Sequence, residues 1–114
     1  MKNDALTIQD ISALAKAVTA NYANFSLASV NDHVVKVSVM TESYNWHYHP
    51  NSDETFMTIE GVLLIDLETE TIELFPGQLF MVPKNVIHRT RPKGDRSVNI
   101  TFEHGQIETR MVNR

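Results

Sequence analysis

The chain has 114 residues, of which 42% are hydrophobic and 21% are charged, with a formal net charge of −4 at pH 7. This length suits a single domain, and the composition is that of a globular protein. The acidic balance argues against binding to nucleic acid, which needs a basic surface. The absence of cysteine excludes disulfides, thiolate catalysis and iron–sulfur ligation. No apolar run has the length of a signal peptide or a membrane span, so we expect a cytoplasmic protein without a membrane partner.

The first predicted element is a helix over Thr7–Val18. The apolar residues that share one face of it at helical spacing are Ile8, Ile11, Leu14, Ala15 and Val18. Thr7 is its predicted N-cap, with Asp10 three residues later in the arrangement of a capping box. Residues 1–24 therefore form a predicted N-terminal helical segment.

From about Val34 onward the pattern changes to the period of two that is typical of strands. The alternating residues at the start of this region are Val35, Lys36, Val37, Ser38, Val39 and Met40. Seven further strands are predicted at 45–49, 55–59, 62–67, 71–75, 79–82, 87–91 and 98–103. Short segments rich in Pro, Gly, Asn and Asp separate them. Many short strands with closely spaced turns predict an all-β sandwich or barrel, here over residues 33–103.

A group of histidine and glutamate residues points to a metal site. His47 and His49 lie two apart on a predicted strand, so both imidazoles share a face. The turn that begins at Pro50 reverses the chain and lets Glu54 return a carboxylate to that face, while His88 arrives from a separate strand. Imidazole and carboxylate suit one divalent ion, with Fe, Mn, Ni and Zn all open. The alternative is a barrel that keeps these residues without binding a metal.

The spacing of these residues resembles the cupin superfamily. The first cupin motif is His-x-His, three or four residues, Glu, six residues and Gly, which His47, His49, Glu54 and Gly61 match. The match extends over most of the chain, so it is far more specific than a single dipeptide.

The second cupin motif is Gly, five residues, Pro-x-Gly, two residues, His, three residues and Asn. Gly77, Pro83 and His88 match it at their spacings. Thr41, Asn85 and Pro92 depart from the two motifs, standing where Gly, Gly and Asn are usual. Asn85 is the mildest departure, because Asn tolerates positive φ better than other non-glycine residues.

The resemblance implies a fold and a ligand set. The fold is an all-β double-stranded β-helix, a cupin jelly-roll barrel of two packed antiparallel sheets with the metal inside, near the wider mouth. The implied metal ligands are His47, His49, Glu54 and His88. The resemblance also implies a homodimer, in which the N-terminal helix packs either across the dimer or on its own barrel.

Strand parity predicts which side chains line a small-molecule pocket beside the metal. The candidates that share a face with the ligands are Asn45, Phe56, Thr58 and Thr90. Parity places Arg89 and Arg91 on the opposite face, where we expect them to be solvated or salt-bridged. His33 and His104 lie outside the motifs and are expected to be surface residues.

Several functions stay open at this point. The first is a metal-dependent enzyme acting on a small organic substrate by dioxygenase-like or Lewis-acid chemistry. A sugar or sugar-phosphate isomerase would need a further acid/base near the metal. The candidates for such a group, Glu60 and Glu103, lie at turn or strand ends and are not convincing. The sequence therefore favours dioxygenase-like or Lewis-acid chemistry over isomerisation. The second function is a non-catalytic module that binds or senses a small molecule. The third, a structural metal, ranks last because such sites normally close their coordination sphere.

Overall fold

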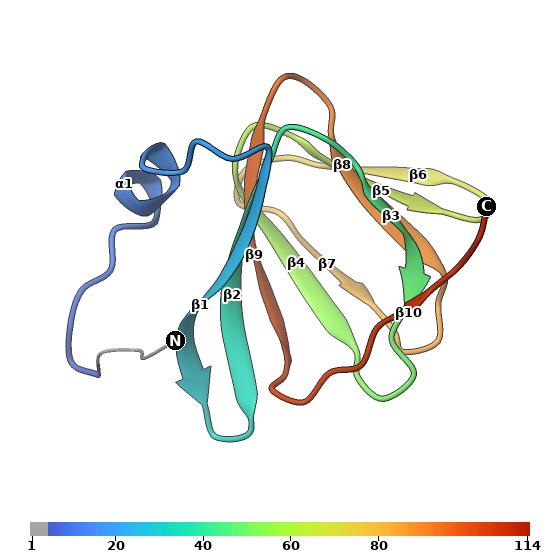
Figure 1. The fold of residues 1–114 in the computed structure, drawn as a ribbon, viewed down its shortest axis with the longest axis horizontal. Helices are drawn as coiled ribbons and strands as arrows, with labels where there is room; N and C mark the ends of the chain where they lie inside the picture. The colour runs from blue at the N-terminus through green and yellow to red at the C-terminus, as the bar shows by residue number, and fades with distance from the viewer. Residues whose placement is uncertain (1–4) are drawn as a thin grey trace.

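Two antiparallel sheets of five strands face each other and form a barrel in the computed structural model, which describes residues 5–114 (Figure 1). Sheet A contains, in spatial order, β1 (Tyr22–Val30), β2 (His33–Met40), β9 (Ser97–His104), β4 (Glu54–Glu60) and β7 (Leu79–Val82). Sheet B contains β10 (Arg110–Met111), β3 (Tyr44–Tyr48), β8 (His88–Pro92), β5 (Leu63–Leu67) and β6 (Thr71–Leu74). This architecture confirms the predicted double-stranded β-helix.

The N-terminal helix is shorter than predicted. Helix α1 spans Ile11–Lys16, and Asp10 caps it by accepting a hydrogen bond from the Ala13 amide at 3.1 Å. The prediction of Thr7 as the N-cap was wrong, since the Thr7 hydroxyl donates to the Ala5 carbonyl instead. Asp10 is the N-cap because its carboxylate accepts a hydrogen bond from an otherwise unpaired amide of the first helical turn. Of the predicted segment 1–24, residues 1–4 lie outside the described residues.

Strand β1 is the element that the sequence reasoning missed. Residues 22–24 were assigned to the helical segment, yet β1 pairs with β2 from Tyr22 opposite Met40 to Val30 opposite His33. Its many small residues give little β signal, and an irregularity between Ser26 and Ala28 breaks its alternation. The pairing with β2 therefore decides its conformation, and the barrel begins at residue 22 rather than 33.

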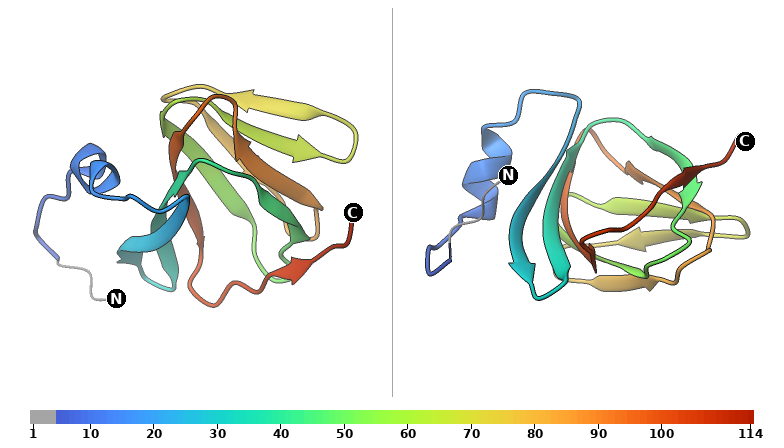
Figure 2. Two further views of the ribbon diagram at one scale, coloured as in Figure 1. Left: turned by 45° about the horizontal axis from the view of Figure 1, so that its top comes forward. Right: turned by 60° about the horizontal axis from the view of Figure 1, so that its bottom comes forward.

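The apolar residues gather in two separate clusters. One lies between α1 and the outer face of sheet A, and its buried members are Ala15, Leu27, Val37, Val39, Val98 and Ile100. The other lies between the two sheets and consists of Met40, Phe56, Leu63, Ile65, Leu74 and Val82. Helix α1 accordingly lies outside the barrel, beside β1 (Figure 2). The rest of the barrel interior is left to polar side chains, which form the site described below.

Asn85 adopts the backbone conformation expected from its place in the second motif. Its φ is 71°, in the left-handed region that the glycine of the motif would otherwise occupy. The Asn85 amide donates a hydrogen bond to the His49 carbonyl at 2.8 Å. This turn therefore ties the segment before β8 to the segment that follows β3.

A buried aspartate holds the two arginines of β8. Arg89 Nε and Arg91 Nε lie 2.7 and 2.8 Å from Asp66 Oδ2, and the Thr71 hydroxyl donates to Asp66 Oδ1 at 2.6 Å. The prediction that both arginines turn away from His88 into salt bridges is confirmed. The hydrogen bond from Arg91 holds the pKa of the Asp66 carboxyl well below its usual range.

Asp66→Asn is expected to lower the free energy of unfolding at neutral pH by about 2 kcal/mol, because it removes the buried partner of two charges. A carboxyl whose pKa is depressed by folding contributes stability above its ordinary pKa of 3.8 and loses it as pH falls further. The difference between wild type and variant should therefore shrink below about pH 4 in urea titrations. Glu73→Gln, which breaks the exposed pair with Lys93, should have almost no effect. A difference independent of pH would contradict this account.

Candidate metal centre

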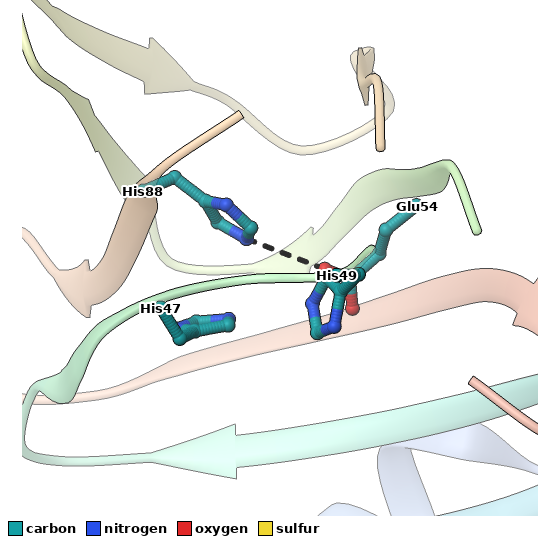
Figure 3. A group of neighbouring side chains, drawn as sticks. All are labelled: His47, His49, Glu54 and His88. Atoms are coloured by element: carbon teal, nitrogen blue, oxygen red, sulfur yellow. Dashed lines mark hydrogen bonds and ion pairs between the residues drawn. The ribbon is translucent and has the colours of Figure 1, made fainter. Parts of the chain in front are cut away.

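Four side chains from three strand regions converge inside the barrel. His47 belongs to β3, His49 follows it directly, and Glu54 and His88 are the first residues of β4 and β8. One ligand atom from each lies within 4.8 Å of all the others, and Figure 3 shows the side chains turned toward one another. His47 pairs directly with His88 across β3 and β8, which places both imidazoles on one face. The structure therefore brings together all four residues that the sequence proposed as ligands.

The three imidazoles are oriented by the same device. In each ring Nδ1 lies within hydrogen-bond distance of a backbone carbonyl, and a carbonyl only accepts, so Nδ1 carries the proton. The acceptors are the carbonyls of Asn45 for His47 at 2.6 Å, Glu108 for His49 at 3.0 Å and Val86 for His88 at 2.9 Å. The Nε2 atoms remain for the centre, and the buried His88 Nε2 has no hydrogen-bond partner among the described residues. This is the arrangement of metal-binding histidines.

Glu54 supplies the negative charge of the centre. Its Oε1 lies 3.1 Å from His49 Nε2 and 3.4 Å from His88 Nε2. Burial raises the pKa of Glu54, but its contacts with His49 and His88 outweigh burial and hold that pKa below its usual range. Burial likewise lowers the pKa of His49, but the hydrogen bond and charge of Glu54 outweigh burial and raise it. Burial and the neighbouring His88 lower the pKa of His47 to about 4. The lowered pKa values of Glu54 and His47 favour the carboxylate and the neutral imidazole, which are the forms that bind a cation.

The donor set fits a divalent first-row metal. Three imidazole nitrogens and one carboxylate oxygen can serve Fe, Mn, Ni or Zn, and thiolate is absent from the chain. Four protein ligands leave two positions of an octahedral ion for water or for ligand oxygens. The structure offers space for them, since a cavity of ≈ 240 Å³ borders His47, His49 and Glu54.

Two of the four predicted pocket residues line this cavity. Phe56 and Thr90 do so, whereas Asn45 and Thr58 do not. Asn45 is exposed because the register of β3 shifts between Tyr44 and His47, and this shift turns Tyr44 into the cavity in its place. The parity argument was therefore wrong at Asn45. Thr58 is fully buried, but its hydroxyl donates to the Leu74 carbonyl at 2.9 Å, away from the centre.

Glu103 is a cavity residue that the sequence reasoning set aside. It lies opposite Glu54 in the pairing of β9 with β4, is buried, and lines the cavity. Burial and the charge of Glu54 raise the pKa of Glu103 to about 7, although Lys36 Nζ lies 3.3 Å away. The signal that could have found it is the run of polar residues at alternate positions of β9, which ends at Glu103.

The C-terminal segment after β9 completes the site, although the barrel was predicted to end at residue 103. The Glu108 carbonyl orients His49, while Ile107 and Thr109 line the cavity. Asn51 holds this segment by donating to the Gln106 carbonyl at 3.0 Å and accepting from the Glu108 amide at 2.8 Å. The segment has no strand-like alternation, so only its contacts with the barrel reveal its place.

Asn51→Ala is expected to lower the affinity for a divalent metal by about tenfold, because it frees the segment whose carbonyl orients His49. Competition with a chromogenic chelator would measure the change. Asn45→Ala is the matched control, since the Asn45 side chain is exposed and the hydrogen bond to His47 is made by its backbone carbonyl. Equal affinities in the two variants would show that the Asn51 contacts do not support the ligand.

The fold and the centre define a class, a double-stranded β-helix barrel with a buried group of three histidines and one glutamate. The family model described as a cupin domain matches residues 33–102, and the chain belongs to this family. Among solved structures, a cupin-2 domain containing protein from Shewanella frigidimarina NCIMB 400 aligns with a TM-score of 0.79 at 24% identity, covering 85% of this chain and 94% of that one. That likeness shows the shared fold.

Sequence relatives extend the comparison. An uncharacterized protein of Bacillus subtilis (strain 168), YdbB, is 44% identical over 106 residues, which are 92% of this chain and 93% of that protein. Polyketide synthase CurC of Streptomyces cyaneus is 39% identical over 61 residues, which are 54% of this chain and 40% of CurC.

Within residues 5–114, no helix is long and apolar enough to cross a membrane.

Proposed function

We propose that this protein is a metal-dependent enzyme that binds a small organic substrate at the centre of His47, His49, Glu54 and His88. The observation that carries the proposal is that three of the four ligands, His47, His49 and Glu54, border a cavity, so the centre is open on one side. A structural metal site would normally have a closed coordination sphere. A divalent ion bound here supplies Lewis-acid polarisation of a substrate oxygen or, if redox-active, dioxygenase-like chemistry.

The residues of the chain fix how a substrate would meet this centre. Backbone carbonyls hold the three imidazoles, so the ligand geometry is set before a substrate arrives. The cavity on the open side admits only a small molecule, and Phe56 and Thr90 form part of its wall. The ligand side chains are buried, so their contacts with a substrate form in a region of low dielectric, where electrostatic interactions are stronger.

Glu103 favours a second candidate reaction, a proton transfer of the kind an isomerase performs. Such a reaction needs an acid/base group beside the metal. The Glu103 carboxylate lines the cavity and neighbours the ligand Glu54 across the two strands. With this acid/base group beside the metal centre, proton transfer and oxygen chemistry are both compatible with the site.

Turnover assays on metal-loaded protein test the proposal. Protein loaded in turn with Fe, Mn, Ni and Zn would be incubated with diketones, thiols, phenolic acids and hydroxy acids, and oxygen uptake and substrate loss would be followed. Diketones belong in the panel because the name of the relative CurC concerns polyketide synthesis. Turnover by one metal form that disappears in Glu54→Gln is the expected result. Tight ligand binding without turnover would favour the sensing module instead.

The openness of the centre can be tested without a substrate. Manganese-loaded protein is expected to speed the relaxation of solvent water protons, because water at the open positions exchanges with the solvent. A manganese ion enclosed by protein ligands would give almost no enhancement and would favour a structural role for the metal.

The homodimer implied by the family resemblance stays a prediction.

A further inference from the structure

The polar wall, defined here as Lys36, Asn99, Thr101 and Glu103, forms one continuous surface of the cavity. Asn99, Thr101 and Glu103 occupy alternate positions of β9 and are only 2%, 2% and 5% exposed. Lys36 joins them from β2, where it pairs with Thr101 and its Nζ lies 3.3 Å from Glu103. The wall belongs to sheet A, and it faces the three histidines that sheet B and the segment after β3 supply.

The two faces of β9 differ sharply in polarity. Its outward residues Val98 and Ile100 belong to the apolar cluster beneath α1. Its inward residues are polar, although the inward face of a barrel sheet is normally its apolar core face. The interior at this end of the barrel is therefore suited to polar contents.

Two atoms of the polar wall are buried without a hydrogen-bond partner among residues 5–114, namely Asn99 Oδ1 and Thr101 Oγ1. Unpaired buried polar atoms cost free energy and are uncommon in native proteins, so each calls for a specific explanation. Thr58 on the adjacent strand β4 shows the ordinary solution, because its hydroxyl donates to the Leu74 carbonyl. The cavity is where partners for Asn99 and Thr101 would enter.

The chemistry of the wall selects hydroxyl groups. A threonine hydroxyl and an asparagine amide each donate and accept hydrogen bonds, as a ligand hydroxyl does. Lys36, the cation of the wall, is paired with Glu103, and Arg89 and Arg91, which turn away from the cavity, bind Asp66. A phosphate group binds best to arginine side chains that are not already paired, so this wall is poorly suited to phosphate. The cavity of ≈ 240 Å³ is also smaller than the pockets of about 300–1,000 Å³ that hold drug-sized ligands.

We infer that the polar wall binds the hydroxyl groups of a small polyhydroxylated carboxylic acid, whose carboxylate and adjacent hydroxyl ligate the metal ion facing the wall. The inference rests on the proposed function, since it requires an open metal centre. It names a substrate class that is small, rich in hydroxyl groups and free of phosphate.

Calorimetry on the zinc-loaded protein with two probes tests this assignment. Glycolate offers only the chelating carboxylate and hydroxyl, and threonate adds two further hydroxyl groups to the same chelate. Threonate is expected to bind more tightly, on the order of tenfold, through its contacts with the wall. Equal affinities would overturn the inference and leave the proposed function standing. A failure of both probes to bind zinc-loaded protein would overturn the inference, and the water-proton relaxation of the manganese-loaded protein would then show separately whether the open centre of the proposed function stands.

A pair of matched variants separates ligand binding from folding. Thr101→Val removes the unpaired hydroxyl at constant volume, so we expect it to abolish the preference for threonate while the melting temperature stays equal or rises. Thr58→Val should lower the melting temperature, because that hydroxyl has a partner, and should keep the preference. Asn99→Leu provides a second test of the wall. The inference is overturned if Thr101→Val keeps the preference, or loses as much stability as Thr58→Val.

Discussion

Replacing His88 with alanine is expected to lower the affinity of the protein for a divalent metal by more than about a hundredfold. Loss of a group that merely orients a ligand costs about 10- to 100-fold, so loss of the ligand itself costs more. His88 is fully buried, and its Nε2 has no hydrogen-bond partner among residues 5–114, so alanine leaves one corner of the centre empty. Glu54→Gln keeps the shape but removes the anionic oxygen that neighbours both His49 and His88.

Metal content after dialysis, measured by mass spectrometry, would give the stoichiometry, and chelator competition would give the affinity. His33→Ala is the matched control, because His33 is exposed and contacts Asp32 away from the centre. Circular dichroism would show that each variant keeps its strands. Full metal content in both His88→Ala and Glu54→Gln would show that the ion binds elsewhere, and the assignment of the centre would then be wrong.

Gly61→Ala is expected to destabilise the protein by on the order of 3 kcal/mol, for two independent reasons. Gly61 has a φ of 73°, which a residue with a Cβ adopts only at a cost. An added Cβ would also lie 2.4 Å from the Arg96 carbonyl oxygen and 3.3 Å from Ser97 Cα. Both are backbone atoms, of the residue before β9 and of its first residue, so relief of the contact would disturb the strand that carries the polar wall. The melting temperature should fall by about 15 °C.

Gly77→Ala separates the two causes. Gly77 has a φ of 84° but no atom within 4 Å of the added Cβ, so only the backbone cost of about 1 kcal/mol applies. Gly94→Ala, with neither feature, should have almost no effect. Thermal unfolding of the three variants should therefore rank them Gly61, Gly77 and Gly94 in decreasing loss. Equal losses for Gly61→Ala and Gly77→Ala would show that the contact with Arg96 is relieved at no cost.

Local signals in the sequence were sufficient for the ligands and for most of the barrel. His47 and His49 share a face because alternate residues of a strand always do, and the motif spacing added Glu54 and His88. The strand at 79–82 was predicted with its observed bounds, because turn residues flank it on both sides. Strand β1 could not be predicted in this way, since its conformation depends on pairing with β2 rather than on its own residues.

By itself, the sequence determined the all-β class of the fold, because strand periodicity and turn residues act over a few neighbouring positions. The set of four candidate ligands followed from that periodicity together with the spacing of the cupin motifs. The tertiary structure decided what surrounds those ligands. Because of a register shift in β3, the side chain of Tyr44 lines the cavity and that of Asn45 does not. Strand pairing brought Glu103 beside Glu54. Contacts across more than 50 residues of chain placed the Glu108 carbonyl on His49. Such long-range contacts depend on register and on the meeting of distant segments, which no local pattern records.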